Sequence, residues 1–99
     1  KEGDWLPIHV TSDALVINVG DMLQRLTNNI MRSTTHRVVN PPQERLHLPR
    51  FSMPFFVHPD ERMPLNCLEM CISENNPKAF DDITAGEYLQ QRLKEIGLA

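Results

Sequence analysis

Four short apolar runs, each closed by turn-forming residues or proline, constrain the fold of this chain more than any other feature. Each run is rich in β-branched or aromatic side chains, which favours strands. The run at residues 14–19 is broken only by Asn18 and predicts a strand buried on both faces. The other runs cover residues 5–10, 31–39 and 50–57.

Two further segments have a different local pattern. Residues 22–26 fit either a helical turn or a short strand, and the next residues, Thr27, Asn28 and Asn29, predict a turn in which the asparagines adopt positive φ. Near the end of the chain, Thr84 and Glu87 form the pattern of a capping box. A terminal helix is therefore expected, with an apolar stripe and a glycine stop at Leu89, Leu93, Ile96 and Gly97.

Strands in series followed by one helix predict a mainly β domain, either an antiparallel sandwich or a jelly roll. A closed jelly roll needs about eight strands, and this sequence offers four or five. The chain is thus expected to form half of a double-sheet domain. Residues 1–83 would supply its strands and loops, and residues 84–99 its final helix and tail.

Composition excludes several classes of protein. The 99 residues carry a net charge of −3 without a Lys/Arg run, so we expect no nucleic-acid partner. The longest apolar run is far too short to span a bilayer, and the first residues do not have the pattern expected of a signal peptide. A zinc site needs four ligands, and Cys67 and Cys71 are the only cysteines, with no second pair to complete such a site. They are therefore expected to be small apolar residues in a reducing cytoplasm.

The most informative stretch runs from residue 18 to residue 56. It contains Asn-Val-Gly-Asp at 18–21, Ser-Thr-Thr-His-Arg-Val-Val at 33–39 and Arg-Phe-Ser at 50–52, followed by Pro-Phe-Phe at 54–56. In this order and spacing the strings resemble the C-terminal half of the isopenicillin N synthase-like branch of the Fe(II) and 2-oxoglutarate oxygenases. The Ile-Thr-Ala-Gly-Glu-Tyr-Leu string at 83–89 extends the resemblance to essentially the whole chain.

The resemblance implies the C-terminal half of a double-stranded β-helix and an oxidoreductase that uses Fe(II), 2-oxoglutarate and O2. Such enzymes hold iron by two histidines and one carboxylate. The last of these ligands maps to His36, and the anchor of 2-oxoglutarate maps to Arg50 with Ser52. Arg37, next to the ligand, is expected to face the opposite side and to be structural. The implied reaction oxidises an unactivated C–H bond of a small organic substrate and releases succinate and CO2.

The chemistry of Arg50 and Ser52 suits this role. A guanidinium can bind a carboxylate through two parallel hydrogen bonds. The two residues are separated by one position, so on a strand their side chains share a face. One carboxylate could then meet the guanidinium and the hydroxyl together.

The two remaining iron ligands are not found in this sequence. His58-Pro59-Asp60 matches the family's His-x-Asp string, but it follows the Arg-x-Ser strand, whereas the family's motif lies well upstream of the last histidine. These ligands are therefore expected outside the chain, in an N-terminal half of the same domain. The isolated chain is expected to lack activity.

Two alternatives remain open at this stage. An Fe(II) oxidase of the same fold would use no 2-oxoglutarate, and Arg50 and Ser52 would then bind the carboxylate of the substrate itself. A catalytically inactive jelly-roll module would instead use Trp5 and the phenylalanines as an apolar contact surface.

Overall fold

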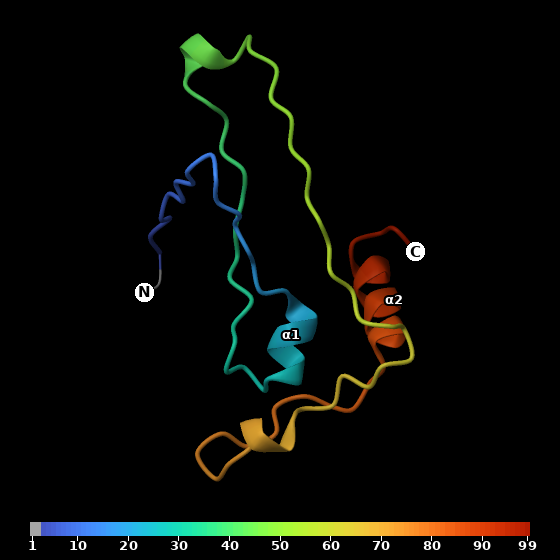
Figure 1. Cartoon of the computed structure of the whole chain (residues 1–99). Coiled ribbons are helices and arrows are strands. Elements are labelled where there is room, and N and C mark those ends of the chain that lie inside the picture. The colour runs from blue at the N-terminus through green and yellow to red at the C-terminus, as the bar shows by residue number, and fades with distance from the viewer. Residues whose placement is uncertain (1–2) are drawn as a thin grey trace.

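The regular secondary structure of the chain is helical. The computed structural model describes residues 3–99. Its α-helices are α1, Asp21–Leu26, and α2, Ala85–Glu95, and two short 3₁₀ helices, η1, Gln43–Arg45, and η2, Glu69–Cys71, lie between them (Figure 1). The ambiguous segment at residues 22–26 is therefore a helix.

The expected strands do not form β-ladders in the part of the chain that the structure describes. Residues 3–19, 31–42 and 46–60 run mostly as open traces without helix or strand, with turns at residues 12–13 and 46–47 (Figure 1). The bridges present are isolated pairs, Pro64 with Thr84 and Ser73 with Asn76. A strand is stabilised by hydrogen bonds to a neighbouring strand, so β-forming residues without that neighbour stay extended but unpaired. The prediction of a mainly β chain is not met within these residues.

The burial predicted for residues 14–19 is also wrong for this chain. Leu15 is 91% exposed and Ile17 is 89% exposed. The apolar pattern predicts burial in a complete domain. Within residues 3–99, no helix or other segment covers this run.

The buried side chains gather in one region, which we call the basal lobe and define as residues 20–30 together with residues 60–97. Leu65, Ala85 and Tyr88 form its apolar centre, and Met22 and Ile83 pack against them. Cys67 is buried in the same lobe and is a free thiol, as expected from the sequence. The lobe thus joins two segments that lie far apart in the sequence.

The N-terminus of α2 is held by hydrogen bonds to residues 61–63. The backbone N–H groups of Ala85 and Gly86 donate to the carbonyls of Met63 and Glu61, at 2.9 and 2.8 Å. Gly86 suits this close approach, because a Cβ there would lie 3.0 Å from Cβ of Glu61 and 3.1 Å from its carbonyl oxygen, so Glu61 would have to move. Satisfied N–H groups and this close contact hold α2 against residues 61–65.

Both ends of α2 confirm the sequence prediction. Thr84 accepts a hydrogen bond from the N–H of Glu87, and the Glu87 carboxylate accepts one from the N–H of Thr84, which completes the capping box. At the other end, Gly97 has φ +76°, and the N–H of Leu98 donates to the carbonyl of Leu93 at 2.8 Å. This pattern is a Schellman motif, which satisfies the last carbonyls of the helix.

Side chains of α1 tie the two helices together. The guanidinium of Arg25 lies 5.0 Å from the ring centres of both Phe80 and Tyr88, and it donates to the carbonyl of Asp81 at 2.7 Å. Asp21 and Arg92 form an ion pair at 3.6 Å. Burial raises the pKa of the Tyr88 phenol, in keeping with its place in the lobe.

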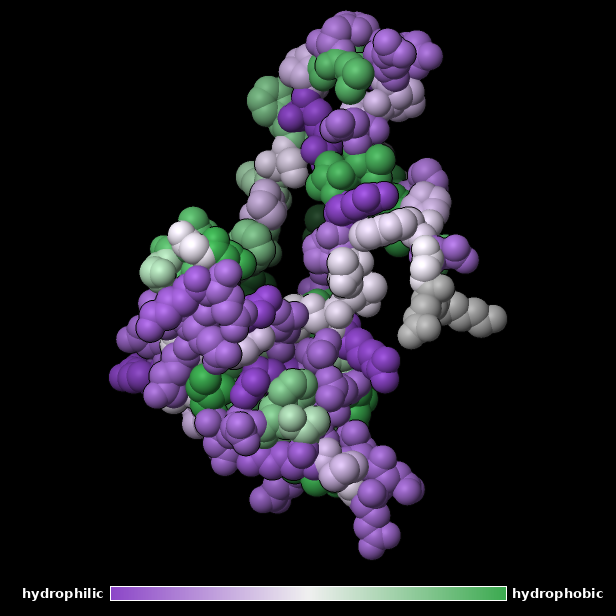
Figure 2. Space-filling model, turned by 180° about the vertical axis from the view of Figure 1, so that it is seen from behind, coloured by the Kyte–Doolittle hydropathy of each residue, from purple (hydrophilic) through white to green (hydrophobic). Residues whose placement is uncertain are grey.

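Residues 31–59 project from the lobe as an extended loop, which we call the arm. η1 lies at its far tip (Figure 1). The radius of gyration is 17.3 Å, against about 13 Å for a compact domain of 100 residues, so the arm is not folded onto the lobe. Figure 2 shows apolar side chains open on its surface, and Phe51, Phe55 and Val57 are each at least 85% exposed. None of the helices described is long and apolar enough to cross a membrane.

Candidate functional site

His36 lies on the outgoing side of the arm, three residues beyond Ser33, and its ring is exposed. Nδ1 of the ring lies 2.9 Å from the carbonyl oxygen of Thr34. A carbonyl oxygen can only accept, so Nδ1 must carry the proton in this contact. In the neutral imidazole Nε2 then keeps its lone pair, which is the form that a metal-ligating histidine needs.

Two side chains of the lobe hold the segment that leads to His36. The hydroxyl of Thr27 accepts a hydrogen bond from the N–H of Met31 at 3.2 Å, and Oε1 of Gln24 accepts one from the N–H of Ser33. Both acceptors come from α1 or its C-cap. The start of the arm is therefore fixed by polar contacts, while its apolar residues remain uncovered.

Arg37, the residue after His36, contacts the N-terminal segment. Its guanidinium lies 4.2 Å from the centre of the Trp5 ring. A cation over an indole face at this distance is attracted by the ring, by about 0.5–1 kcal/mol at an exposed site. This contact supports the structural role predicted for Arg37 and places residue 5 beside the segment that carries His36.

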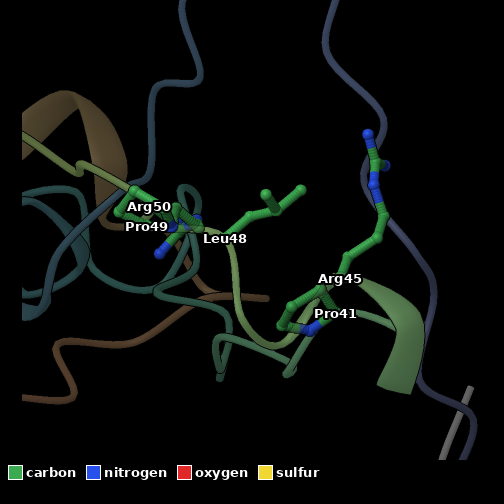
Figure 3. Close-up of a pocket in the computed structure, with 5 residues that line it drawn as sticks. All are labelled: Pro41, Arg45, Leu48, Pro49 and Arg50. Carbon is green, nitrogen blue, oxygen red and sulfur yellow. The ribbon is translucent and has the colours of Figure 1, made fainter.

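Arg50 lies on the returning side of the arm and lines a hollow near its tip. Pro41, Arg45, Leu48 and Pro49 line the same hollow. Figure 3 shows the long side chain of Arg45 extending away from Arg50, so the two guanidinium groups do not converge on one ligand. Ser52 is exposed, two residues further along.

The three predicted site residues do not line a common hollow among the two described here, one near the tip of the arm and one at the N-terminal segment. Arg50 lines the one near the tip, and the other is lined by Gly3, Asp4, Trp5 and Thr35. Among residues 3–99, no three His, Cys, Asp or Glu side chains are grouped so as to hold a metal ion. The joint placement of His36, Arg50 and Ser52 in one cavity therefore stays a prediction for the complete domain.

The rejected string at residues 58–60 has other contacts. His58 packs edge-on against Phe56, with ring centres 6.1 Å apart. The Asp60 carboxylate pairs with the guanidinium of Arg62 at 3.1 Å, and these hydrogen bonds lower the pKa of Asp60.

Asn28 is the residue whose importance the sequence pattern understated. The turn prediction is confirmed, since Asn28 and Asn29 have φ 47° and 67°. The side chain of Asn28, however, is fully buried in the lobe. The two hydrogens of its amide nitrogen are shared among three carbonyls, at Cys71, Asn76 and Pro77, and its oxygen accepts from the N–H of Ala79 at 2.9 Å. A buried polar residue at a turn gives no periodic signal, so sequence reasoning could not single it out.

Comparison with known proteins places the chain in a family. Residues 1–59 match the model of the 2OG-Fe(II) oxygenase superfamily. The azadirone synthase of Melia azedarach is 36% identical over 92 residues, which are 93% of this chain and 26% of that protein. The 2-oxoglutarate-Fe(II) type oxidoreductase ppzC of Metarhizium majus is 32% identical over 96 residues, which are 97% of this chain and 25% of that protein. The chain thus spans about a quarter of the length of these relatives.

A solved structure agrees with this assignment. A 2OG-Fe(II) oxygenase family protein from Caulobacter crescentus is 54% identical to the chain and superposes with a TM-score of 0.91, over 95% of this chain and 31% of that one. The open path of the arm therefore follows the corresponding segment of that solved structure. Fe(II) and 2-oxoglutarate are the cofactors that this family implies. The chain belongs to the 2OG-Fe(II) oxygenase superfamily.

Proposed function

We propose that this chain supplies the C-terminal part of the catalytic jelly roll of an Fe(II) and 2-oxoglutarate-dependent oxygenase, with His36 as one iron ligand. The observation that carries the proposal is the contact between Nδ1 of His36 and the Thr34 carbonyl. It fixes the tautomer in which Nε2 can bind a divalent metal, and it lies within the string that matches the family.

Arg50 and Ser52 are proposed to bind the distal carboxylate of 2-oxoglutarate. Both are exposed polar residues on the returning side of the arm, opposite the side that carries His36. When bound, Fe(II) and 2-oxoglutarate supply the chemistry that oxidises an unactivated C–H bond of a small organic substrate with O2 and releases succinate and CO2. The chain's own residues hold the metal on one side and the co-substrate on the other.

The partner of this chain is proposed to be the other half of the same domain. Apolar residues of the arm and the N-terminal segment are exposed to a degree that a folded protein does not maintain, with Leu15, Phe51 and Phe55 each at least 90% exposed. Strands of the missing half would pair with these extended segments and supply the other two iron ligands. A cytoplasmic location is part of the same proposal.

Replacing His36 tests the proposal in the complete protein. His36→Ala is expected to abolish 2-oxoglutarate decarboxylation and to weaken Fe(II) binding sharply. His47→Ala removes an exposed histidine near the tip of the arm and serves as the matched control. Near-normal turnover of the His36→Ala protein would contradict the proposal that His36 binds iron.

A further inference from the structure

The charges of this chain are divided unequally between the arm and the other residues. The arm contains four arginines, Arg32, Arg37, Arg45 and Arg50, and one acidic residue, Glu44, and all five are exposed. Its formal charge is therefore +3, whereas the whole chain has −3, so the residues outside the arm carry −6. The arm is a basic projection from an acidic chain.

The arginines of the arm have no acidic partner among residues 3–99. The ion pairs in this part of the chain all lie within the basal lobe, where carboxylates neutralise Arg62, Lys78 and Arg92. In the arm, the guanidinium of Arg37 contacts the ring of Trp5, which leaves its charge in place. Exposed cations without a counter-charge attract anions over about 8 Å at physiological ionic strength.

Arg45 lies beside the residue that is proposed to anchor 2-oxoglutarate. It lines the same hollow as Arg50, and the residues that line this hollow include no carboxylate. The side chain of Arg45 extends away from Arg50 (Figure 3), so the two guanidinium groups do not grip one carboxylate together. The charge of Arg45 nevertheless acts on an anion that approaches the hollow, because Coulomb attraction needs no contact.

We propose that Arg45 steers 2-oxoglutarate toward Arg50 and so raises the rate at which the co-substrate is captured, without binding it. The inference rests on the proposed function, because it takes Arg50 as the anchor of the co-substrate. 2-Oxoglutarate is a dianion at neutral pH, so one positive charge near its path acts on two negative charges. The contribution of Arg45 is one of charge and not of geometry.

The association of 2-oxoglutarate with the complete protein tests the proposal. The protein is loaded with Fe(II) and kept free of O2, so that the co-substrate binds without turnover, and stopped-flow fluorescence gives the association rate constant. Arg45→Gln is expected to lower this constant about threefold at an ionic strength of about 0.01 M, since a unit charge about 10 Å from a dianion in water has an effect of this order. At about 1 M salt the attraction is screened, and parent and variant are expected to agree.

Two further variants separate charge from geometry and from the net charge of the protein. Arg45→Lys keeps the charge and loses the planar guanidinium, so it is expected to match the parent at every ionic strength. Arg62→Gln makes the same chemical change at an exposed arginine of the basal lobe and is expected to leave the association rate constant unchanged. With saturating 2-oxoglutarate and O2, Arg45→Gln is expected to keep the parent's kcat, because Arg45 does not touch the bound co-substrate.

The possible results are distinct. An association rate constant for Arg45→Gln equal to the parent's at low salt would overturn the inference, as would an equal loss in Arg45→Lys or in Arg62→Gln. An effect of Arg45→Gln on the primary substrate alone would also overturn it. If the parent protein bound no 2-oxoglutarate, the proposed function would fail and the inference with it, whereas normal binding that does not depend on residue 45 refutes the inference alone.

Discussion

Asn28 combines two properties that few residues can supply together, a backbone in the left-handed region and a side chain that satisfies buried polar groups. Glycine could adopt its φ of 47° but would leave the Pro77 carbonyl and the Ala79 N–H without a partner, and the Cys71 and Asn76 carbonyls with one donor fewer. Most other residues could do neither. Asparagine tolerates this conformation and carries both donors and an acceptor, which explains why it occupies the position.

Substitution of Asn28 separates these two contributions. Asn28→Ala is expected to lower the free energy of unfolding of the complete protein by about 3 kcal/mol, because it leaves the Pro77 carbonyl and the Ala79 N–H without a partner and places an alanine at positive φ. Asn28→Gly loses the same side-chain bonds but keeps the backbone unstrained, so its loss should be smaller by about 1 kcal/mol. Urea unfolding measures both. Equal losses for Ala and Gly would show that backbone strain contributes nothing at this turn.

Arg50 is the residue that distinguishes the two enzymatic alternatives. Arg50→Lys keeps the charge but loses the planar fork, so the apparent Michaelis constant for 2-oxoglutarate is expected to rise substantially. Ser52→Ala removes one hydrogen bond to a charged group, which is a smaller loss of about 1.5–3 kcal/mol. Steady-state kinetics with each substrate varied in turn measures both variants. If Arg50→Lys changes only the dependence on the primary substrate, the oxidase that uses no 2-oxoglutarate is correct.

At the scale of elements, α2 was predictable and the strands were not, for one physical reason. The capping box and the glycine stop are local, and a helix satisfies its hydrogen bonds within its own segment. The predicted apolar stripe was wrong at Ile96, which is 62% exposed, because the helix buries Ala85 and Tyr88 instead. A strand needs a second strand to satisfy its backbone hydrogen bonds. The runs at residues 31–39 and 50–57 therefore predict an extended backbone, but they do not predict which segment pairs with it. The motif strings located His36, Arg50 and Ser52, but bringing them together depends on the same missing neighbours.

The capping box of α2 also makes the stability of the lobe depend on pH. The backbone N–H of Thr84, and then its hydroxyl, lower the pKa of Glu87 below its ordinary value of 4.5. A carboxyl group with a lowered pKa in the folded state stabilises that state above its ordinary pKa, and this contribution is lost as the pH falls through the lowered value.

Glu87→Gln is expected to remove this acid-dependent part of the stability, because the amide can still accept a hydrogen bond but does not titrate. Thermal unfolding of the parent and the variant between neutral pH and about pH 3 measures the difference. The gap between their melting temperatures should narrow as the pH falls. A gap that stays constant over this range would contradict the role of the carboxylate.

At the scale of the whole molecule, the open arm predicts how the 99-residue chain behaves alone. It carries one proposed iron ligand, and its extended segments expose both apolar side chains and unpaired backbone groups, which invite pairing with another chain. The isolated chain is expected to show no 2-oxoglutarate decarboxylation and to self-associate. A decarboxylation assay and light scattering measure these two properties. Iron-dependent turnover by the chain alone would refute the assignment of the other ligands to a missing half.

The lobe holds both ends of the arm, and this has a consequence for how the protein can vary. Residue 31 leaves from α1, and residue 60 returns to the segment that caps α2, so the separation of these two points is set by the lobe alone. Extra residues inserted near η1 would then cost mainly the entropy of closing a longer loop, which rises by only about 0.6 kcal/mol for each doubling of loop length. The far end of the arm can therefore change in length while the polypeptide path past His36 stays the same.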